Sequence, residues 1–405
     1  MLAVRALSCA ALVAVAWAVA CPVAASAAPS DWSQSGQGAA RHADNRGETI
    51  LSRSTVGALH RSPVIFPSRC NAGRPIVSGG VVYTAVQLAG SCQIEAFAEN
   101  GTPIWVTDLP GSSYSNNFAV ADGVLVAPDF FGNLNAFDTS DGSFLWAAPA
   151  GGVSSQPVIA NGVVYLDYGH VAAVDLHTGT VLWTGPVIDT LGQTTPAIWH
   201  TEMFVVENNT VHAFDTGDGH ALWSASCRAA GAVSGDASPM VLKGIVYSSS
   251  KCAVDALTGT PVVLKPPKNP NVYATLATSA DATGGARIFG GYRWGVSSTQ
   301  QYATLEAFTP GAGRQLWHHD FAYDLSSGAW PFGYGPVVAN GVVYVADQTH
   351  STSSMQTAIL RAYNTRTGRQ LWHSKPINAW VYGISVADGR LWANPVGGTI
   401  RCWTL

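Results

Sequence analysis

Short apolar segments recur along most of the chain, and each is bounded by glycine, asparagine or proline. Runs of β-branched and aromatic residues follow a glycine at positions 80–83, 123–126, 162–165, 244–247 and 341–344. A shorter apolar segment marked by proline precedes most of these runs, as at positions 156–160, 195–198 and 335–338. Runs of this composition between such boundaries predict β-strands. The pattern therefore indicates an all-β protein built from many short strands.

A longer pattern follows each of these strand pairs. It starts with Ala and an apolar residue, often continues with Asp, turns at a Gly and ends on a Trp. Its copies are AFAENGTPIW (96–105), AFDTSDGSFLW (136–146), AVDLHTGTVLW (173–183), AFDTGDGHALW (213–223), AVDALTGTPVV (253–263, the Trp lost), AFTPGAGRQLW (307–317) and AYNTRTGRQLW (362–372). A period of about 40 residues in a strand-rich chain is typical of β-propeller blades.

Each copy predicts a hairpin that carries a tryptophan. Gly supplies the positive φ of the turn, and the carboxylate that opens the turn accepts nearby backbone N–H groups, so Asp138, Asp175, Asp215 and Asp255 are interpreted as turn formers. The indole rings are predicted to cover the gap against a neighbouring sheet and to offer a donor N–H. These docking residues are Trp105, Trp146, Trp183, Trp223, Trp317 and Trp372.

The repeat predicts the architecture of the whole mature chain. One period contains four strands, and three further strands follow the last copy, in residues 380–404. A strand near Leu59 to Phe66 is expected to supply their missing fourth member, because otherwise a sheet edge would stay open. Residues 28–405 are therefore predicted to form one eight-bladed β-propeller of four-stranded antiparallel blades, closed by strands from both ends of the chain.

The repeat Ala-x-Asp-x-x-Thr-Gly-x-x-x-Trp resembles the tryptophan-docking repeat of the quinoprotein (pyrroloquinoline-quinone) propeller family. It is similar in particular to the non-dehydrogenase branch, the outer-membrane assembly lipoprotein propellers. That resemblance implies a periplasmic scaffold that binds other proteins through strand edges or loops. Dehydrogenases of the family are typically much longer and carry a vicinal Cys-Cys disulfide with a calcium site of Glu, Asn and Asp. No two cysteines are adjacent in this chain.

The N-terminal residues 1–27 have the features of a secretory signal. One basic residue, Arg5, precedes an apolar run and a small-residue end at Ala25-Ser26-Ala27. The run is shorter than the roughly 18–20 residues that span a bilayer, and Pro22 follows it, so no transmembrane segment is expected. A lipid anchor on Cys21 is disfavoured, because Ala18 stands where a larger aliphatic residue is usual. The protein is thus expected in the periplasm or outside the cell.

Composition narrows the possible partners. Without the signal the chain keeps 20 basic and 25 acidic residues, and no basic block is present. Nucleic acid is not expected as a partner, because phosphate binding needs clustered basic residues. A protein or carbohydrate ligand fits the composition better, and its identity stays open.

An exported protein can form disulfides. Cys70 and Cys92 precede the first and third strands of one blade, and Cys227 and Cys252 hold nearly the same places in another. We therefore predict disulfides between Cys70 and Cys92 and between Cys227 and Cys252, although spacing alone does not fix the connectivity. Cys402 occupies the position of the repeat's Ala and is interpreted as a buried free thiol.

Binding residues are expected on the loops before the first strand of each blade and between its second and third strands. In a four-stranded propeller these loops lie on one face, around the central axis. Scattered polar residues occur on any solvated loop. The candidate ligand-binding residues are Asn117, Gln156, Asp167, His170, Gln193, Glu207, Asp236, Arg293, Trp294, Tyr334, Asp347 and Tyr382.

Other candidate chemistry is sparse. The aromatic residues between 292 and 334 suit either sugar or peptide contact or capping of two enlarged blades. His318 and Asp320 should point to one side of a strand and His319 to the other, which is too few ligands for a metal site. Hydrolase, zincin and nucleotide motifs are absent from the sequence.

We therefore predict a non-catalytic binding or assembly scaffold with no cofactor and no metal. A quinone-dependent dehydrogenase with calcium is the first alternative, and a carbohydrate-active propeller enzyme is the second.

Overall fold

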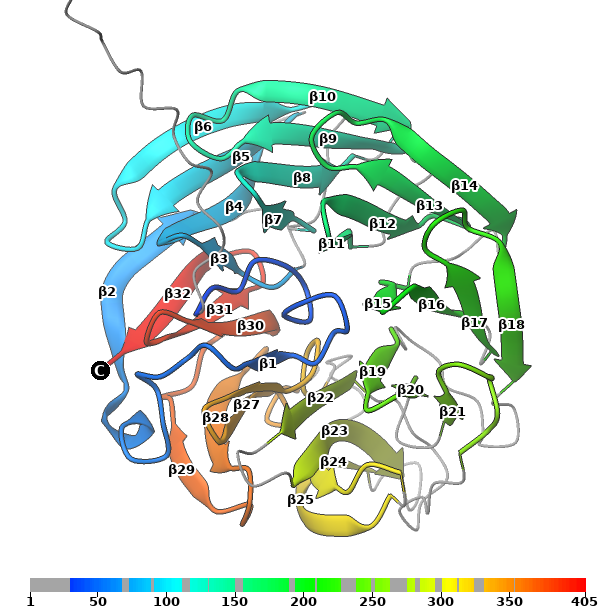
Figure 1. The fold of residues 1–405 in the computed structure, drawn as a ribbon. Coiled ribbons are helices and arrows are strands. Elements are labelled where there is room, and N and C mark those ends of the chain that lie inside the picture. Colours follow the sequence, from blue (N-terminus) through cyan, green and yellow to red (C-terminus); the bar gives the residue numbers. More distant parts are fainter. Residues whose placement is uncertain are drawn as a thin grey trace, which may run out of the picture.

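The computed structural model forms a ring of eight small antiparallel sheets, which are the predicted blades (Figure 1). It describes residues 30–67, 73–88, 91–110, 117–129, 131–149, 156–188, 194–207, 210–226, 238–248, 252–262, 275–280, 285–295, 301–311, 313–323, 331–352 and 354–405. The only helix in this part of the chain is the 3-10 turn η1 (Val56–Ala58). The predictions for residues 1–27 lie outside it.

The strands follow the repeat in sequence order. Blade 1 contains β3 (Ile76–Ser78), β4 (Val81–Leu88), β5 (Ser91–Ala98) and β6 (Pro103–Leu109); blade 2 β7 (Ala119–Ala121), β8 (Val124–Pro128), β9 (Asn133–Asp138) and β10 (Phe144–Pro149); blade 3 β11 (Val158–Ala160), β12 (Val163–Asp167), β13 (His170–Asp175) and β14 (Val181–Val187); blade 4 β15 (Ala197–Trp199), β16 (Glu202–Glu207), β17 (Thr210–Asp215) and β18 (Ala221–Ser226). Blade 5 contains β19 (Met240–Leu242), β20 (Ile245–Tyr247) and β21 (Ala253–Asp255); blade 6 β22 (Thr275–Ala280), β23 (Ala286–Gly295), β24 (Gln301–Phe308) and β25 (Gln315–Tyr323); blade 7 β26 (Val337–Ala339), β27 (Val342–Asp347), β28 (Ile359–Asn364) and β29 (Gln370–His373).

Blade 8 confirms the predicted closure. It consists of β30 (Val381–Ala387), β31 (Arg390–Pro395), β32 (Thr399–Thr404) and β2 (His60–Pro67), in the order β2-β32-β31-β30. Strand β2 pairs antiparallel with β32, from His60 opposite Thr404 to Pro67 opposite Thr399. Strands from the two ends of the sequence therefore lie side by side in one sheet, and β32 has a partner on both sides.

Two blades depart from the predicted four strands. Blade 7 gains a fifth member, because β1 (Asp44–Asn45) pairs parallel with β26. Blade 5 has three strands among the described residues, and its fourth position holds a single bridge between Val254 and Pro261. This is the blade whose repeat lacks the Trp.

The six predicted docking tryptophans join neighbouring blades. Each indole N–H donates to a backbone carbonyl of the next blade or of the segment that leads into it: Trp105 to Thr139, Trp146 to Leu176, Trp183 to Thr216, Trp223 to Ala256, Trp317 to Thr365 and Trp372 to Leu59. Where the next blade has a turn glycine, the ring lies over it: a Cβ built on Gly219 would stand 2.4 Å from Trp183 Cε3. The glycine thus serves both the positive φ of the turn and the docking of the ring.

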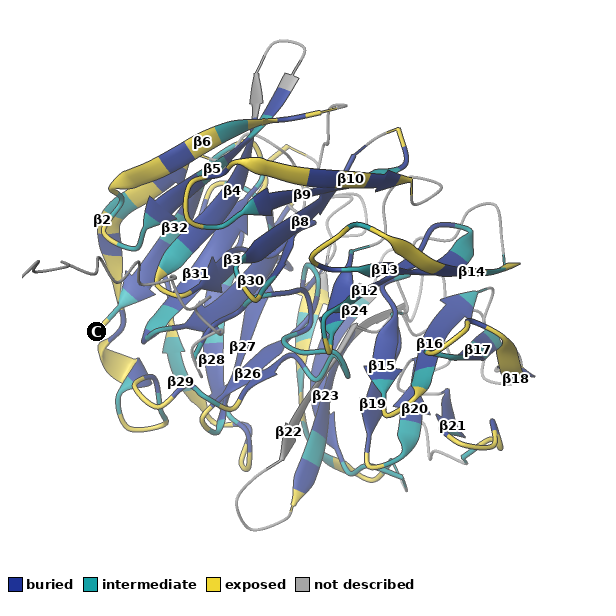
Figure 2. Cartoon of the chain, turned by 45° about the horizontal axis from the view of Figure 1, so that its top comes forward, coloured by how far each residue is buried: buried dark blue, intermediate teal, exposed yellow. Residues whose placement is uncertain are grey.

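Burial divides each blade into an inner and an outer part (Figure 2). The first three strands are mostly buried, whereas the fourth strands expose aliphatic and aromatic side chains such as Ile104, Phe144 and Leu182. Cys402 confirms its predicted place: it pairs with Trp392 where the other blades place Ala, is buried and forms no disulfide. Cys70 and Cys227 lie outside the described residues, so the two disulfides stay predictions.

Residues 31–49, which we call the strap, run across the innermost strands at one end of the ring (Figure 1). The strap hydrogen-bonds in turn to Val77, Val120, Ile159, Ile198, Val241, Val338 and Val386, which belong to the first strands of all blades except blade 6. The Asp31 carboxylate also accepts from Ser78 Oγ (2.8 Å) and Gly79 N (2.9 Å), at the turn between β3 and β4. The strap therefore ties the blades together from the inside.

Candidate functional site

The two ends of the ring differ in the loops that they present. Because the strands of a blade alternate in direction, the loops before the first strand and between the second and third strands share one face. We call it the rim face. The turns between the first and second strands, and between the third and fourth, form the opposite hairpin face, where the strap begins at Asp31. The candidate binding residues belong to the rim face by this topology.

Two pairs of candidate residues come together across blade boundaries. Gln156 Nε2 donates to Asn117 Oδ1 at 3.0 Å, which links the loops of blades 2 and 3. The rings of Tyr334 and Tyr382 stack with centroids 6.2 Å apart and an interplanar angle of 28°. Tyr334 N donates to Tyr382 O at 2.8 Å, so backbone and rings hold the loops of blades 7 and 8 together. Both tyrosines are half-buried and can offer a ring surface to a ligand.

The described carboxylates of the rim face interact with different neighbouring side chains. Asp347 is fully buried and accepts from Arg361 Nε (2.6 Å) and Thr349 Oγ1 (2.5 Å). Asp167 accepts from Thr194 Oγ1 at 2.8 Å. Glu207 Oε2 lies 3.6 Å from His212 Nε2, and burial lowers the pKa of that imidazole. Each carboxylate is therefore held by a separate partner.

The rim-face acid Asp129 has a structural role. It accepts from the backbone of Phe131 and Asn133 (both 2.8 Å) and from the side-chain amides of Asn133 (2.9 Å) and Asn135 (3.3 Å). Four donors on one buried carboxylate fix the loop between β8 and β9.

Arg74 is one of the polar residues of the loop that leads into the first blade, and nothing in the sequence singles it out there. Its guanidinium donates to Ile384 O (2.8 Å) and Tyr334 O (2.6 Å), and it lies 5.9 Å from the centre of the Trp32 ring. Burial lowers its pKa to about 10. Arg74 thereby positions the loop of Tyr334 next to blade 8. The only sequence signal for this role is the position of Arg74 just before the first strand of a blade.

The remaining candidates do not join these pairs. His170 begins β13 and is half-buried. Gln193 and Asp236 lie outside the described residues, and for Arg293 and Trp294 only the backbone within β23 is described. Sequence placed all these residues on one face, and among those that the structure describes, only neighbours in adjacent blades are brought together.

Among the described residues of the rim face, no group of three or more acidic, His or Cys side chains lies close enough together to hold a metal ion. Calcium takes six to eight oxygen ligands that converge on one point. Here Asp129, Asp167, Glu207 and Asp347 are each committed to a different local partner, and both terminal nitrogens of the Arg74 guanidinium are bonded to backbone. No step through calcium and a quinone cofactor is derived.

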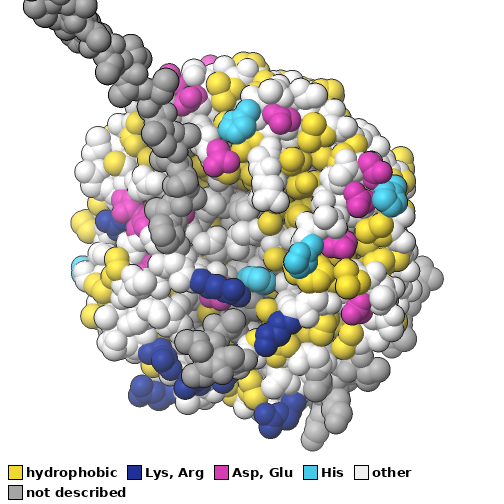
Figure 3. Space-filling view, viewed as in Figure 1, with side chains coloured by type: hydrophobic (Ala, Val, Ile, Leu, Met, Phe, Trp, Pro, Cys, Tyr) yellow, Lys and Arg dark blue, Asp and Glu magenta, His cyan; other side chains and the backbone are white. Residues whose placement is uncertain are grey.

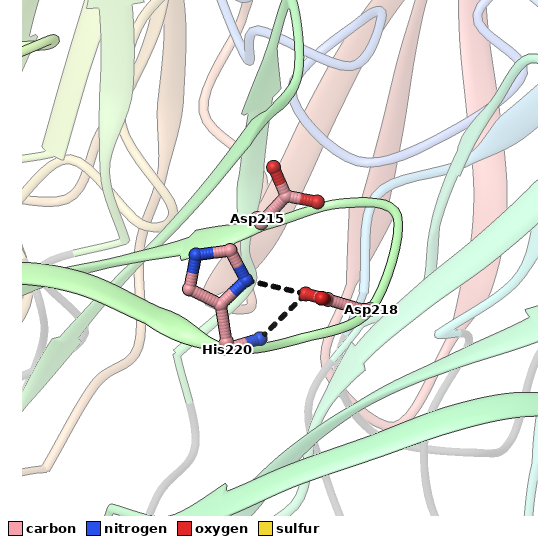
Figure 4. A group of neighbouring side chains, drawn as sticks. All are labelled: Asp215, Asp218 and His220. Carbon is pink, nitrogen blue, oxygen red and sulfur yellow. Dashed lines mark hydrogen bonds and ion pairs between the residues drawn. The ribbon is translucent and has the colours of Figure 1, made fainter.

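In the described part of the chain, one compact group of potential metal ligands is found, Asp215, Asp218 and His220 on the hairpin face (Figure 4). Asp218 Oδ1 lies 2.6 Å from His220 Nδ1 and accepts from His220 N at 3.0 Å, and Asp215 accepts from Gly217 N at 2.7 Å. The hydrogen bond to Asp218 raises the pKa of His220. These contacts are those of a hairpin turn, and the corresponding turn of blade 2 uses Asp138 and Asp141 in the same way.

His318, His319 and Asp320 also lie as their alternation in a strand predicts. His318 Nε2 is 3.8 Å from Asp320 Oδ2 on one side of β25. His319 Nε2 is 2.7 Å from Gly368 O of the neighbouring blade on the other side. This histidine therefore takes part in docking between blades 6 and 7.

Eight blades, six of which dock onto the next through a tryptophan, define a β-propeller of the PQQ-like repeat class. The family of the outer membrane protein assembly factor BamB matches residues 90–278 and 301–403. The chain therefore belongs to that family.

Individual relatives are more distant. The outer membrane protein assembly factor BamB of Moranella endobia (strain PCIT) is 26% identical over 225 residues, 48% of this chain and 56% of that protein. The chain spans about half the length of the curated relatives it matches.

Solved structures share the fold. The crystal structure of BamB from Moraxella catarrhalis aligns with a TM-score of 0.59 at 17% identity, over 86% of this chain and 98% of that one. A europium-containing methanol dehydrogenase aligns with a TM-score of 0.66 at 12% identity, over 93% and 98%. At such identities these likenesses show the fold alone, because one fold hosts many functions. No helix in the described residues has the length and apolarity needed to cross a membrane.

Proposed function

We propose that this protein is an exported, non-catalytic propeller that binds a protein partner at its rim face and acts as an assembly scaffold in the cell envelope. The membership in a family named for outer membrane protein assembly supports the class of function. The predicted signal at residues 1–27 supports export. The stacked Tyr334 and Tyr382 supply the ring surface that protein interfaces commonly use.

One observation carries the non-catalytic part of the proposal. Three described carboxylates of the rim face, Asp129, Asp167 and Asp347, each accept from a separate donor, and Glu207 lies 3.6 Å from the His212 imidazole. General acid–base catalysis and metal binding need groups that converge on one reacting centre. A surface of locally satisfied polar groups with adjacent aromatic rings suits binding instead.

Binding and turnover can be tested on the same purified protein. The binding probe is an unfolded outer-membrane β-barrel protein, titrated into the wild type and into Tyr334→Ala/Tyr382→Ala. We expect the double variant to bind about tenfold more weakly, because aromatic anchors dominate protein interfaces. Phe144→Ala is the matched control, since its exposed ring lies on the outer strand of blade 2.

The alternative activity is tested by adding pyrroloquinoline quinone and calcium and following dye reduction with alcohols and aldose sugars. We expect no turnover. Tight cofactor binding with turnover would overturn the scaffold proposal in favour of a dehydrogenase. Loss of probe binding in Phe144→Ala but not in the tyrosine variant would refute the rim face as the binding surface.

A further inference from the structure

The fourth strands of blades 1 to 4 expose more apolar surface than those of blades 6 and 7. In the described part of the chain 14 large hydrophobic side chains are exposed, and eight of them lie on β6, β10, β14 and β18. None of the 14 lies on β25 or β29. The four strands of blades 1 to 4 follow one another along the outside of the ring (Figure 1), and we call their exposed surface the outer wall.

A repeated β-bulge aims part of this apolar surface outward. In each of the four blades the pairing of the third and fourth strands shifts register at the docking Trp, which leaves the preceding residue without a partner. A bulge of this kind re-aims a side chain. Blades 6 and 7 have the same bulge, but there Leu316 and Leu371 pack against the core. The exposure is therefore a property of blades 1 to 4 and not of the repeat. The outward residues, each 41–49% exposed, are Ile104, Leu145, Leu182 and Leu222.

The same four blades carry no Lys or Arg. Residues 75–227, which contain these blades, hold 14 Asp and Glu and neither of the two basic residues. Residues 28–74 and 228–405 hold 20 Lys and Arg and 11 Asp and Glu. Figure 3 shows Asp and Glu among apolar side chains over blades 1 to 4, whereas most Lys and Arg lie elsewhere in that view. The outer wall therefore belongs to a region of negative charge.

Carboxylates border the outer wall at its hairpin end. Asp175 and Asp215 open the turns that lead into β14 and β18, and Asp141 lies just before β10. Among the ion pairs that the structure describes, none joins these three carboxylates to Lys or Arg. The backbone N–H of Thr178 lowers the pKa of Asp175, and the backbone N–H of Ser143 lowers the pKa of Asp141. The wall is thus apolar with fixed negative charge along its border.

A patch of this size and charge fits one kind of partner better than others. Single exposed apolar side chains are normal, but a contiguous apolar patch marks an interaction site. An anionic membrane or a nucleic acid would be repelled by a surface without Lys or Arg. A second copy that used the same wall would place negative charge against negative charge. A polypeptide that carries both apolar and cationic side chains complements the wall in both respects.

We propose that the outer wall is a second docking surface, separate from the rim face, for a protein segment that combines apolar side chains with Lys or Arg. The apolar side chains of the segment contact the outward leucines of β14 and β18, and its cations face the carboxylates of the adjoining turns. This proposal goes beyond the function proposed for the rim face and does not rest on it.

The probe is a synthetic peptide of alternating Leu and Lys, roughly twelve residues long, which spans about 40 Å when extended. Its matched control is the peptide of alternating Leu and Glu. Fluorescence anisotropy with the purified full chain should show about tenfold weaker binding of the Leu-Glu peptide, because only Lys complements the carboxylates. Binding of the Leu-Lys peptide should weaken with salt, since the Debye length falls from about 10 Å at 0.1 M to about 3 Å at 1 M. Equal binding of the two peptides would overturn the proposal.

Two double variants separate the apolar contribution from the charged one. Leu182→Ser/Leu222→Ser should weaken binding of the Leu-Lys peptide about tenfold, because a few central contacts carry most of the affinity of an interface. Asp175→Asn/Asp215→Asn should weaken it roughly threefold at low salt and less at high salt. Asn364 opens the corresponding turn of blade 7 and accepts the same backbone N–H groups, so the neutral residue keeps the turn.

The matched control is Ile65→Ser on the outer strand of blade 8. Its side chain is 52% exposed but lies outside the acidic blades, so binding of the Leu-Lys peptide should be unchanged. Binding should also be unchanged in Tyr334→Ala/Tyr382→Ala, the variant that tests the rim face. The proposal would be overturned by an equal loss in Ile65→Ser, by full binding in Leu182→Ser/Leu222→Ser, or by a loss confined to the tyrosine variant, which would place the peptide on the rim face.

Sedimentation and vesicle binding test the other occupants. The wild type and Leu182→Ser/Leu222→Ser should sediment alike and should both fail to bind phosphatidylcholine vesicles. Self-association of the wild type that the double variant abolishes would make a second copy the occupant, and vesicle binding abolished in the same way would make it a lipid surface. Either result would overturn the proposal. Circular dichroism checks that each variant is folded.

Discussion

Blades 5 and 8 differ from the other blades at the position of the outer strand, as far as the structure describes them. Blade 8 takes β2 from the start of the chain, with pairing along most of the strand from His60 to Pro67. In blade 5, the described residues at the place of the fourth strand form one β-bridge, between Val254 and Pro261. The ring is therefore closed at its junction by a strand from the other end of the sequence, whereas blade 5 shows only this bridge in the part of the chain that the structure describes.

The side-chain contacts that join neighbouring blades also differ between the ring junction and blade 5. Trp372 of blade 7 still donates to Leu59 O, just before β2, so the usual indole contact reaches the closing strand. Blade 5 has no docking Trp, and Tyr247 Oη accepts from Gly311 N of blade 6 at 2.9 Å. The corresponding Tyr83 and Tyr165 also hydrogen-bond to the next blade, at Thr139 and Thr216, beside their docking Trp. The junction between blades 5 and 6 therefore keeps the tyrosine contact and lacks the indole, with less buried ring surface.

The largest effect is expected from removing the closing strand. Deletion of residues 31–66 should lower the free energy of unfolding by an amount comparable to the whole stability of a domain, about 5–15 kcal/mol. The physical reason is that β32 would then expose unpaired backbone groups and Trp392 would lose Phe66, whose ring lies 5.5 Å away. Hydrogen exchange should rise first in residues 383–392 and 400–403.

A shorter deletion separates the strand from the strap. Removing residues 31–49 keeps β2 and should leave the protection of β32 closer to that of the wild type, while the inner strands exchange faster. If the long deletion leaves residues 400–403 as protected as before, the closure by β2 does not stabilise blade 8.

The contact between a docking Trp and the turn glycine of the next blade can be tested by comparing two glycines of similar positive φ. Gly219→Ala should lower the free energy of unfolding by about 2–4 kcal/mol, because its Cβ would meet the Trp183 ring at 2.4 Å in addition to the strained positive φ. Gly162→Ala has φ +75° and no atom within 4 Å of the added Cβ, so about 1 kcal/mol is expected. Chemical denaturation compares the two, and equal losses would mean that docking on Gly219 adds nothing.

Much of this architecture follows from short-range sequence. Each blade is one period, so the hairpin signal from Ala173 to Trp183 already contains the turn, its glycine and the docking ring. The closing strand is predictable because the last three strands lack a partner. The reduced blade 5 is visible only as the missing Trp at position 263, and the acceptor role of Tyr247 depends on a residue 64 positions away.

The strap and the rim were harder to predict for a physical reason. The strap follows no repeat, and its path depends on one or a few hydrogen bonds to each of seven blades and on positive φ at Gln37, Arg41 and Ala43. The rim pairs Asn117–Gln156 and Tyr334–Tyr382 depend on how adjacent blades are rotated, which the sequence of either loop does not specify.

A smaller loss of stability is expected from the Tyr247 contact between blades 5 and 6. Tyr247→Phe leaves Gly311 N without its acceptor and should cost about 1 kcal/mol. The matched control is Tyr344→Phe, the corresponding residue of blade 7, because its buried hydroxyl has no partner among the described groups. This control should be neutral or slightly stabilising. Equal effects of the two substitutions in thermal unfolding would show that the Tyr247 hydroxyl does not join blades 5 and 6.

The smallest effect concerns the inner edge of blade 5, where the strap contacts β19. His42 Nε2 lies 2.6 Å from Val241 O, and Ala40 O accepts from Val241 N at 3.1 Å. Burial lowers the pKa of His42, the Val241 carbonyl opposes that shift, and the positive charge of Arg46 adds to it.

A folded-state pKa below the ordinary value of 6.5 means that folding favours the neutral imidazole. That contribution is complete above pH 6.5 and is lost as the pH falls through the folded-state pKa, by at most about 1.4 kcal/mol per pH unit. His42→Gln should flatten the fall in stability between about pH 7.5 and about pH 5, whereas His200→Gln, an exposed histidine of blade 4, should leave it unchanged. Because Val241 belongs to the blade without a full outer strand, exchange at Met240–Leu242 should rise before exchange in β30 as the pH is lowered. An acid response that is identical in His42→Gln and in the wild type would mean that the strap is not held to blade 5 by the neutral imidazole.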